Sequence, residues 1–238
     1  MVRRWQDGPQ TRTRSVDEDS RVNQDQPITL NRPEPQHRRE RQHRPEPQDR
    51  REPRPGAASP EDSADLPIVL LDCGDTLIDE STEIHEDGIV LSGALAPGAE
   101  QMVRDLVAEG HRVALVADGR LRSFENLLAP SGVLDLFETL TCSDAVRHQK
   151  PSPRMFKAAL GSLDLAPEDA ARCVMVGNNL ARDIAGANRM GMTSIHMAWT
   201  PRYPRTPEHQ DEVPDHTIAD PAELLPLLRS LTVPTATP

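Results

Sequence analysis

Short runs of apolar, β-branched residues recur along the chain from Ile68 onward, and stretches with helical spacing separate them. The run Ile68–Leu71 has no polar alternation, which is typical of a strand buried on both faces. Strands that alternate with helices are joined by crossover connections, which favour a parallel sheet. We therefore predict an α/β fold, a three-layer Rossmann-like domain, with strands at Ile68–Leu71, Val113–Ala117, Thr139–Cys142, Cys173–Val176, Thr193–Met197 and, at one edge, Thr217–Ile218.

The segments between these strands predict helices and one hairpin. Residues 97–110 repeat apolar side chains at helical spacing and end in a glycine, which is a common helix terminator. Asp87-Gly88 is a strong hairpin signal, and Ile84 before it and Ile89-Val90 after it would be the two arms. Further helices are expected at Leu121–Leu128, at Ser152–Leu163, before Gly191, and at Pro221–Leu231.

Residues 1–64 differ in composition from the rest of the chain. Arg, Gln, Pro, Glu and Asp dominate them, and the sequence from Arg32 to Glu40 recurs from Arg44 to Glu52 with one change. Such a segment buries too little apolar surface to offset the entropy lost on ordering. We predict a disordered arm over residues 1–64 and one folded domain over residues 65–238. Two alternatives stay open: the arm docks a partner, or the start site is assigned too far upstream.

Charge and cysteine content narrow the class of protein. The formal net charge is −11, and residues 1–62 carry 13 arginines against 12 acidic residues, so the acidic excess lies in the predicted domain. An acidic domain argues against nucleic-acid binding. Three unpatterned cysteines favour a reducing compartment, no apolar run approaches the ~20 residues of a membrane span, and no signal peptide is evident. We expect a cytoplasmic protein without nucleic-acid or membrane partners.

Polar residues follow three predicted strands at their carboxyl ends. Asp72 and Asp75 follow the first strand, Asp118-Gly119 follows the second, and residues 177–183 follow the fourth. Because the carboxyl ends of parallel strands meet at one edge of the sheet, these residues should lie close together. An aspartate in that position can attack phosphorus or hold a metal ion, so the sequence predicts a catalytic site there.

Lys150 adds a cation to this set. It is one of only two lysines in the chain, and it precedes Pro151 at a predicted loop–helix junction. With the strand ends, it makes the chain resemble the haloacid dehalogenase (HAD) superfamily, most of whose members are phosphatases. The resemblance covers about residues 66–231, and it rests on Asp72-Cys-Gly-Asp-Thr76, the strand end at Ala117, Lys150-Pro151 and Val176-Gly-Asn-Asn-Leu-Ala-Arg-Asp183.

The resemblance implies a mechanism. Asp72 would attack phosphorus and form an aspartyl-phosphate, and Lys150 would neutralise the phosphate and Asp72. The substrate phosphate would be bound by Lys150 and by the segments that contain Thr76, Ala117, and the backbone N–H groups of Asp118 and Gly119. Mg²⁺, which prefers oxygen ligands, would be held by Asp72, the Gly74 carbonyl, Asn178 and Asp183.

Three positions depart from the family pattern. Phosphatases of the family usually place a second aspartate, the general acid and base, where Gly74 stands. Asp75 would take that role only if the loop were rearranged, which Gly74 permits. Ala117 has no hydroxyl where Ser or Thr is usual, and Asn178 replaces an aspartate, which should weaken Mg²⁺ binding.

The segment between Leu77 and Pro97 is too short for a helical cap, so a hairpin flap is expected there. An open site would suit a small-molecule or a macromolecular phosphorylated substrate, or an oligomer partner that covers it. The first hypothesis is a Mg²⁺-dependent HAD-type phosphatase. The alternative is a weak or inactive phosphate-binding or regulatory protein. A receiver-type phospho-acceptor is less favoured, because its acceptor aspartate would be expected on a later strand than its metal-binding acids.

Other polar and aromatic residues have simpler interpretations. Cys73 is expected to be a small strand-end residue, and His148 and His196 to be surface or packing residues. Arg182 is expected to be a solvated helix-start residue, with contact to the phosphate as the alternative. The Trp199–Tyr203 loop is expected to pack, with a place at the border of the site as the alternative.

Overall fold

A computed structural model describes residues 66–231 of the chain. The predicted arm, residues 1–64, lies outside the described residues.

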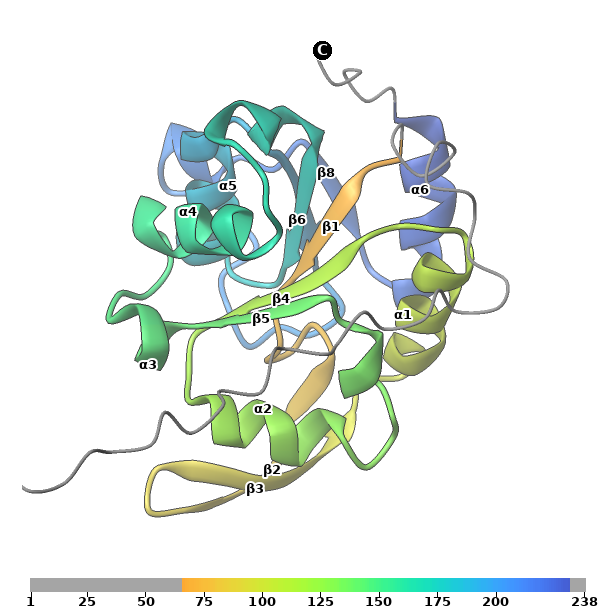
Figure 1. Cartoon of the computed structure of the whole chain (residues 1–238), viewed down its shortest axis with the longest axis vertical. Coiled ribbons are helices and arrows are strands. Elements are labelled where there is room, and N and C mark those ends of the chain that lie inside the picture. The colour runs from red at the N-terminus through yellow and green to blue at the C-terminus, as the bar shows by residue number, and fades with distance from the viewer. Residues whose placement is uncertain (1–65, 232–238) are drawn as a thin grey trace, which may run out of the picture. The chain divides into compact units, whose positions relative to one another are not determined.

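Six strands form one parallel sheet in the order β5-β4-β1-β6-β7-β8 (Figure 1). The sheet places β1 at its centre, with β4 on one side and β6 on the other, so the three strands that precede polar residues are neighbours. The parallel α/β fold predicted from the sequence is confirmed. The strands are β1 (Ile68–Leu71), β4 (Val113–Ala117), β5 (Thr139–Cys142), β6 (Cys173–Gly177), β7 (Thr193–Met197) and β8 (His216–Ile218).

Successive residues of β1 pack into two different apolar layers, one on each face of the sheet. Val69 and Leu71 join a buried cluster that includes side chains of α1 (Ala99–Ala108) and α6 (Leu224–Ser230). Ile68 and Leu70 join a second cluster, formed with α4 (Pro153–Ser162) and α5 (Ala185–Met190). Figure 1 shows these helix pairs on opposite sides of the sheet, so the domain has the predicted three layers.

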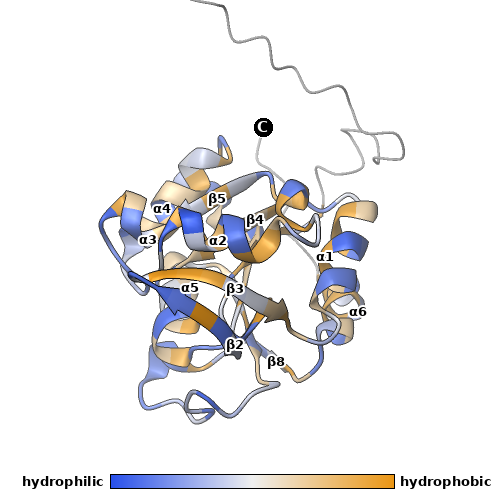
Figure 2. Ribbon diagram, turned by 90° about the horizontal axis from the view of Figure 1, so that it is seen from below, coloured by the Kyte–Doolittle hydropathy of each residue, from blue (hydrophilic) through white to orange (hydrophobic). Residues whose placement is uncertain are grey.

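The predicted hairpin is present and is longer than expected. It consists of β2 (Ile78–Glu86) and β3 (Ile89–Leu95), joined at Asp87-Gly88, where both residues have positive φ as a type I′ turn requires. The backbone of Val90 in β3 is bound to α2 (Leu121–Leu128): its N–H donates to Ser123 Oγ and its carbonyl accepts from Asn126 Nδ2. Figure 2 shows a mostly hydrophilic β2 beside a more apolar β3, as expected when only β3 packs on a helix.

Several short elements have no counterpart in the sequence prediction. The segment before α5 begins with a π-helical turn rather than a regular helix, and the last predicted helix begins with a 3₁₀ turn. Elements this short are stabilised by packing and leave no periodic pattern in the sequence. The elements without a counterpart are α3 (Ser143–Val146), η1 (Leu134–Leu136), η2 (Pro167–Arg172) and η4 (Gln210–Glu212), whereas η3 (Leu180–Ile184) and η5 (Pro221–Glu223) are the first turns of predicted helices.

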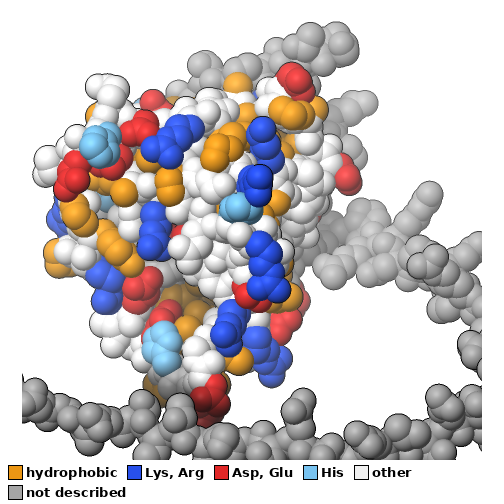
Figure 3. All heavy atoms as spheres, turned by 90° about the vertical axis from the view of Figure 1, so that its left-hand side faces the viewer, with side chains coloured by type: hydrophobic (Ala, Val, Ile, Leu, Met, Phe, Trp, Pro, Cys, Tyr) orange, Lys and Arg blue, Asp and Glu red, His pale blue; other side chains and the backbone are white. Residues whose placement is uncertain are grey.

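The surface that carries α3, α4 and α5 has charges of both signs among many uncharged side chains (Figure 3). Within residues 66–231, no helix is long and apolar enough to cross a membrane.

Candidate active site

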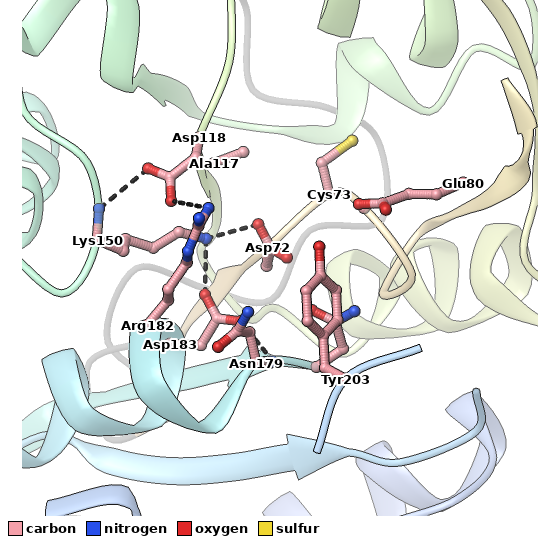
Figure 4. Close-up of a pocket in the computed structure, with 12 residues that line it drawn as sticks. Asp72, Cys73, Glu80, Ala117, Asp118, Lys150, Asn179, Arg182, Asp183 and Tyr203 are labelled. Atoms are coloured by element: carbon pink, nitrogen blue, oxygen red, sulfur yellow. Dashed lines mark hydrogen bonds and ion pairs between the residues drawn. The ribbon is translucent and has the colours of Figure 1, made fainter. Parts of the chain in front are cut away.

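The carboxyl ends of β4, β1 and β6 form the floor of a polar pocket. Because these strands are neighbours, the residues that follow them are brought together although they are far apart in the sequence. Four of the pocket-lining residues are carboxylic acids, and Lys150 lies among them (Figure 4). The pocket is lined by Asp72, Cys73, Gly74, Glu80, Ala117, Asp118, Lys150, Asn178, Asn179, Arg182, Asp183 and Tyr203.

Lys150 connects the strand ends. Its Nζ lies 2.6 Å from Asp72 Oδ1 and 2.7 Å from Asp183 Oδ1, and it donates to the Val116 carbonyl at 2.9 Å. Burial alone would lower the pKa of Lys150, but Asp183 and Asp72 outweigh burial and raise the pKa above its ordinary value. The residue is only 4% exposed, so it is not the solvated lysine that its place before a helix would also allow.

Asp72 lies at the end of β1, and its backbone N–H donates to the Val176 carbonyl of β6. Burial, and then the charge of Asp183, raise the pKa of Asp72 to about 6, although Lys150 opposes the shift. Lys150 therefore keeps Asp72 available as a carboxylate near neutral pH, which a nucleophilic aspartate requires. The structure places Asp72 where the sequence predicted it.

Cys73 lies beside Asp72 and is buried. Burial raises the pKa of its thiol well above the ordinary value, and Asp72 adds to the shift. A thiol that stays protonated is a poor nucleophile, so the structure agrees with the view of Cys73 as a small strand-end residue.

Asp118, which follows the strand end at Ala117, binds residues of two other family motifs. One carboxylate oxygen accepts from the backbone N–H of Lys150 at 3.0 Å, and the other lies 3.4 Å from Arg182 Nη1. Arg182 is half exposed in the first helical turn, as expected, and it also borders the pocket. Gly119 is not among the residues that line this pocket, and its N–H donates to Ser143 Oγ, so in this structure it is not free to bind a phosphate.

The last family motif, residues 176–183, continues from the end of β6 into a tight turn. A Cβ atom on Gly177 would lie 2.6 Å from Asp183 Cβ, so only glycine lets Asp183 fold back against the strand end. Asp183 Oδ2 accepts from the Asn179 N–H at 3.0 Å, and the π-helical turn that starts at Leu180 carries Asp183 toward Lys150. Such turns are frequent at functional sites.

The predicted magnesium ligands all border the pocket: Asp72, Gly74, Asn178 and Asp183. Asn178 is buried at the pocket, and its amide oxygen is the side-chain atom that can bind a cation, whereas Nδ2 can only donate. Mg²⁺ is commonly held by one or two carboxylates and completes its coordination with other oxygens. Two aspartates with amide and carbonyl oxygens fit that chemistry. Within residues 66–231 no cluster of three or more His, Cys, Asp or Glu side chains is arranged to hold a metal ion.

Asp75 and Thr76 lie away from the pocket. Both are fully buried, and neither is among the pocket-lining residues. Asp75 forms an ion pair with Arg202, accepts from the Glu80 N–H at 3.0 Å, and its backbone carbonyl accepts from Trp199 Nε1 at 2.6 Å. These contacts hold Asp75 outside the pocket. They fit a residue that stabilises the loop rather than a general acid that reaches a substrate.

Two pocket residues were not among the site residues expected from the sequence. Tyr203 borders the pocket, so the structure favours the alternative for the Trp199–Tyr203 loop over packing alone. Glu80 extends from β2 into the pocket, and burial, followed by repulsion from Asp75, raises its pKa to about 7. No sequence motif marks Glu80. The one available signal was a carboxylate on the hairpin arm that directly follows the first motif.

Comparisons with known proteins agree with this geometry. Residues 85–191 match the family model for haloacid dehalogenase-like hydrolases. Over these residues the chain is similar to haloacid dehalogenase-like hydrolases, in agreement with the resemblance of its motifs. It is 33% identical over 123 residues to a glyceraldehyde 3-phosphate phosphatase of Methanopyrus kandleri, a match that covers 51% of each chain. It is 32% identical over 126 residues to a phosphoserine phosphatase of Thermus thermophilus, covering 53% of this chain and 48% of that protein.

One solved structure extends the comparison. A HAD phosphatase from Thermococcus onnurineus superposes with a TM-score of 0.50 and 26% identity, covering 58% of this chain and 60% of that one. The chain spans about half the length of the curated relatives it matches. The similarity to the superfamily covers about half of the chain, and the activity and substrate of this protein have to be argued from its own site.

Proposed function

We propose that this protein is a phosphatase that hydrolyses phosphate monoesters through an aspartyl-phosphate on Asp72. One observation carries the proposal: Lys150, at the bottom of the pocket, binds both Asp72 and Asp183 through a single ammonium group. That arrangement holds a carboxylate at a strand end beside a fixed positive charge. Phosphoryl transfer depends mainly on such positioning and charge stabilisation.

The proposed reaction has two steps. An oxygen of Asp72 forms a bond to phosphorus while the bond from phosphorus to the leaving oxygen breaks, and the leaving oxygen takes a proton. Water then attacks the phosphorus of the aspartyl-phosphate and loses a proton, the bond to Asp72 breaks, and inorganic phosphate departs. Lys150 offsets the negative charge of the phosphoryl group in both steps.

Mg²⁺ is the proposed cofactor, with Asp72, the Gly74 carbonyl, Asn178 and Asp183 as its ligands. Bound there, it would offset the charge on the phosphoryl oxygens. Asn178 supplies one charge fewer than an aspartate would, so weak binding is expected. Asp118 and Arg182 stand beside this group, and Arg182 offers the phosphate a cation at the pocket border.

A phosphorylated small molecule is the proposed substrate class. The named relatives act on glyceraldehyde 3-phosphate and on phosphoserine, and their matched segments cover about half of each protein. In the described structure only the β2–β3 hairpin lies between the first motif and α1, so a larger phosphorylated substrate could also reach Asp72.

A screen of phosphorylated metabolites with Mg²⁺ tests the proposal, with wild type beside Asp72→Asn. We expect phosphate release from at least one ester by the wild type and none by the variant. The alternative is a phosphate-binding protein with little turnover, which the glycine at position 74 and the alanine at position 117 favour. Phosphate or Mg²⁺ binding without hydrolysis of any ester would support that alternative instead.

A further inference from the structure

The carboxylate of Glu80 fills the space next to Gly74. A Cβ atom on Gly74 would overlap Glu80 Oε1 and would lie 2.8 Å from Glu80 Cδ. A longer side chain at position 74 would therefore occupy the volume that the Glu80 carboxylate now takes. Figure 4 shows that this carboxylate points from the β2 side toward Asp72.

The contacts of Glu80 hold it in that place. Its N–H donates to Asp75 Oδ1 at 3.0 Å, and its Oε2 lies 3.4 Å from Arg202 Nε. Gly74 also forms a β-bridge with Ile78, which draws the start of β2 against the first motif. The side chain is 29% exposed, so it borders the pocket and still meets water.

The other acidic side chains near Asp72 are each held in place by shorter contacts than the 3.4 Å between Glu80 and Arg202, or lie beside a cation. Asp75 is fully buried and is bound to Arg202 and to the Glu80 backbone. Asp118 is bound to the Lys150 backbone and lies beside Arg182, and Asp183 is bound to Lys150 and to Asn179. Glu80 is thus the carboxyl group that faces the pocket from the side opposite to Lys150 (Figure 4).

We propose that Glu80 is the general acid and base of this site, acting from the hairpin in place of a carboxylate at position 74. This role rests on the proposed phosphatase function. Protonated Glu80 gives its proton to the leaving oxygen as Asp72 bonds to phosphorus. Ionised Glu80 then takes a proton from the water that attacks the aspartyl-phosphate, and the enzyme returns to its starting state.

The first test compares two leaving groups in wild type, Glu80→Gln and Glu83→Gln. With an alkyl phosphate, we expect Glu80→Gln to lose about 10²–10⁴-fold in kcat. With p-nitrophenyl phosphate, whose leaving group needs no proton, Glu80→Gln should release one rapid equivalent of nitrophenol and then accumulate aspartyl-phosphate. Glu83, which pairs with His85 on the same strand and does not line the pocket, is the matched control. Its charge acts on Glu80, so Glu83→Gln should at most shift the pH profile, without a nitrophenol burst.

The second test moves the carboxylate. The backbone of Gly74 is outside the left-handed region, so an aspartate fits there once Glu80 is shortened. Glu80→Ala should lose activity on alkyl phosphates. The double variant, Gly74→Asp with Glu80→Ala, should hydrolyse alkyl phosphates at least tenfold faster than Glu80→Ala. Gly74→Asp alone should gain little, because its side chain would meet Glu80.

Three outcomes overturn the role of Glu80 in an active wild type. They are the absence of a nitrophenol burst from p-nitrophenyl phosphate in Glu80→Gln, no loss of kcat on the alkyl phosphate, and a double variant no better than Glu80→Ala. A wild type that hydrolyses neither substrate overturns the proposed phosphatase function itself.

Discussion

Lys150 shows how much of this site depends on single residues. Its ammonium is buried, and it stabilises two aspartates that would otherwise repel each other. A buried charge without a partner is costly, so each of the three groups depends on the other two. The same dependence makes the site sensitive to changes in charge at neighbouring positions.

Changes at Asn178 and Asp183 test the proposed magnesium site. Asp183→Ala should abolish Mg²⁺ binding in a calorimetric titration, because it removes a carboxylate ligand. Asn178→Asp should bind more tightly than the wild type, because it restores a charge at the pocket. Equal affinity in wild type and Asp183→Ala would exclude Asp183 as a ligand.

His111 should make the stability of the domain dependent on pH. It is buried, its Nδ1 lies 2.8 Å from the Pro67 carbonyl, and burial lowers its pKa. The unfolded chain, in which His has a pKa of about 6.5, then binds more protons than the folded one below that pH. Its contribution is therefore complete above about pH 6.5 and is lost as the pH falls.

The measurement is urea unfolding of wild type and His111→Gln between pH 7 and pH 5, where the unperturbed His group titrates at about 6.5. The free energy of unfolding should fall more steeply with decreasing pH in the wild type than in the variant. Parallel curves would mean that His111 has the same proton affinity in both states.

At the scale of elements, the β2–β3 hairpin and the loop before β8 complete the pocket. The hairpin is fixed to α2 through Val90, and the loop contributes Tyr203 to the pocket lining and Arg202 to the ion pair with Asp75. Asp75 connects the hairpin and the loop, since it binds Arg202, Trp199 and the Glu80 backbone. Its positive φ of 46° is compatible with a residue held in place by tertiary contacts.

Asp75→Asn should weaken the connection between the hairpin and the loop. We expect a loss of about 1–3 kcal/mol in the free energy of unfolding, because a buried hydrogen-bonded charge is removed. The kcat values for alkyl and aryl phosphates should fall by the same factor, since the loop moves without losing an acid. Thermal melting and the ratio of the two rates are the measurements. An unchanged melting temperature with a selective loss on alkyl phosphates would instead make Asp75 the general acid.

At the scale of the whole molecule, residues 66–231 contain both apolar clusters and every residue of the pocket. Shortening the chain to start at Asp65 should therefore keep the melting temperature and any phosphatase activity that the full chain has in the proposed screen. The Arg- and Pro-rich composition of residues 1–64 gives the same expectation, because such segments rarely bury apolar surface. A drop of several degrees on shortening would show that the removed residues stabilise the domain.

The sequence by itself determined the sheet and its functional edge. The apolar runs and the Gly, Asp and Asn residues after them are local signals, because strand burial and turn formation depend on neighbouring residues. They were sufficient to predict β1, β4 and β6 and to bring Asp72, Asp118 and Asp183 to one edge. Lys150 was predicted from its family motif, and the structure puts it between two of these aspartates.

Only the tertiary structure decided what stands at Gly74. Glu80 reaches that space because the hairpin folds back on the first motif, and the 199–203 loop encloses Asp75 from a distant part of the chain. Both depend on contacts between segments rather than on the order of residues. A sequence motif records the side chains of one segment of the chain. Which side chain from another segment fills the space beside Gly74 is decided by the packing of the folded domain.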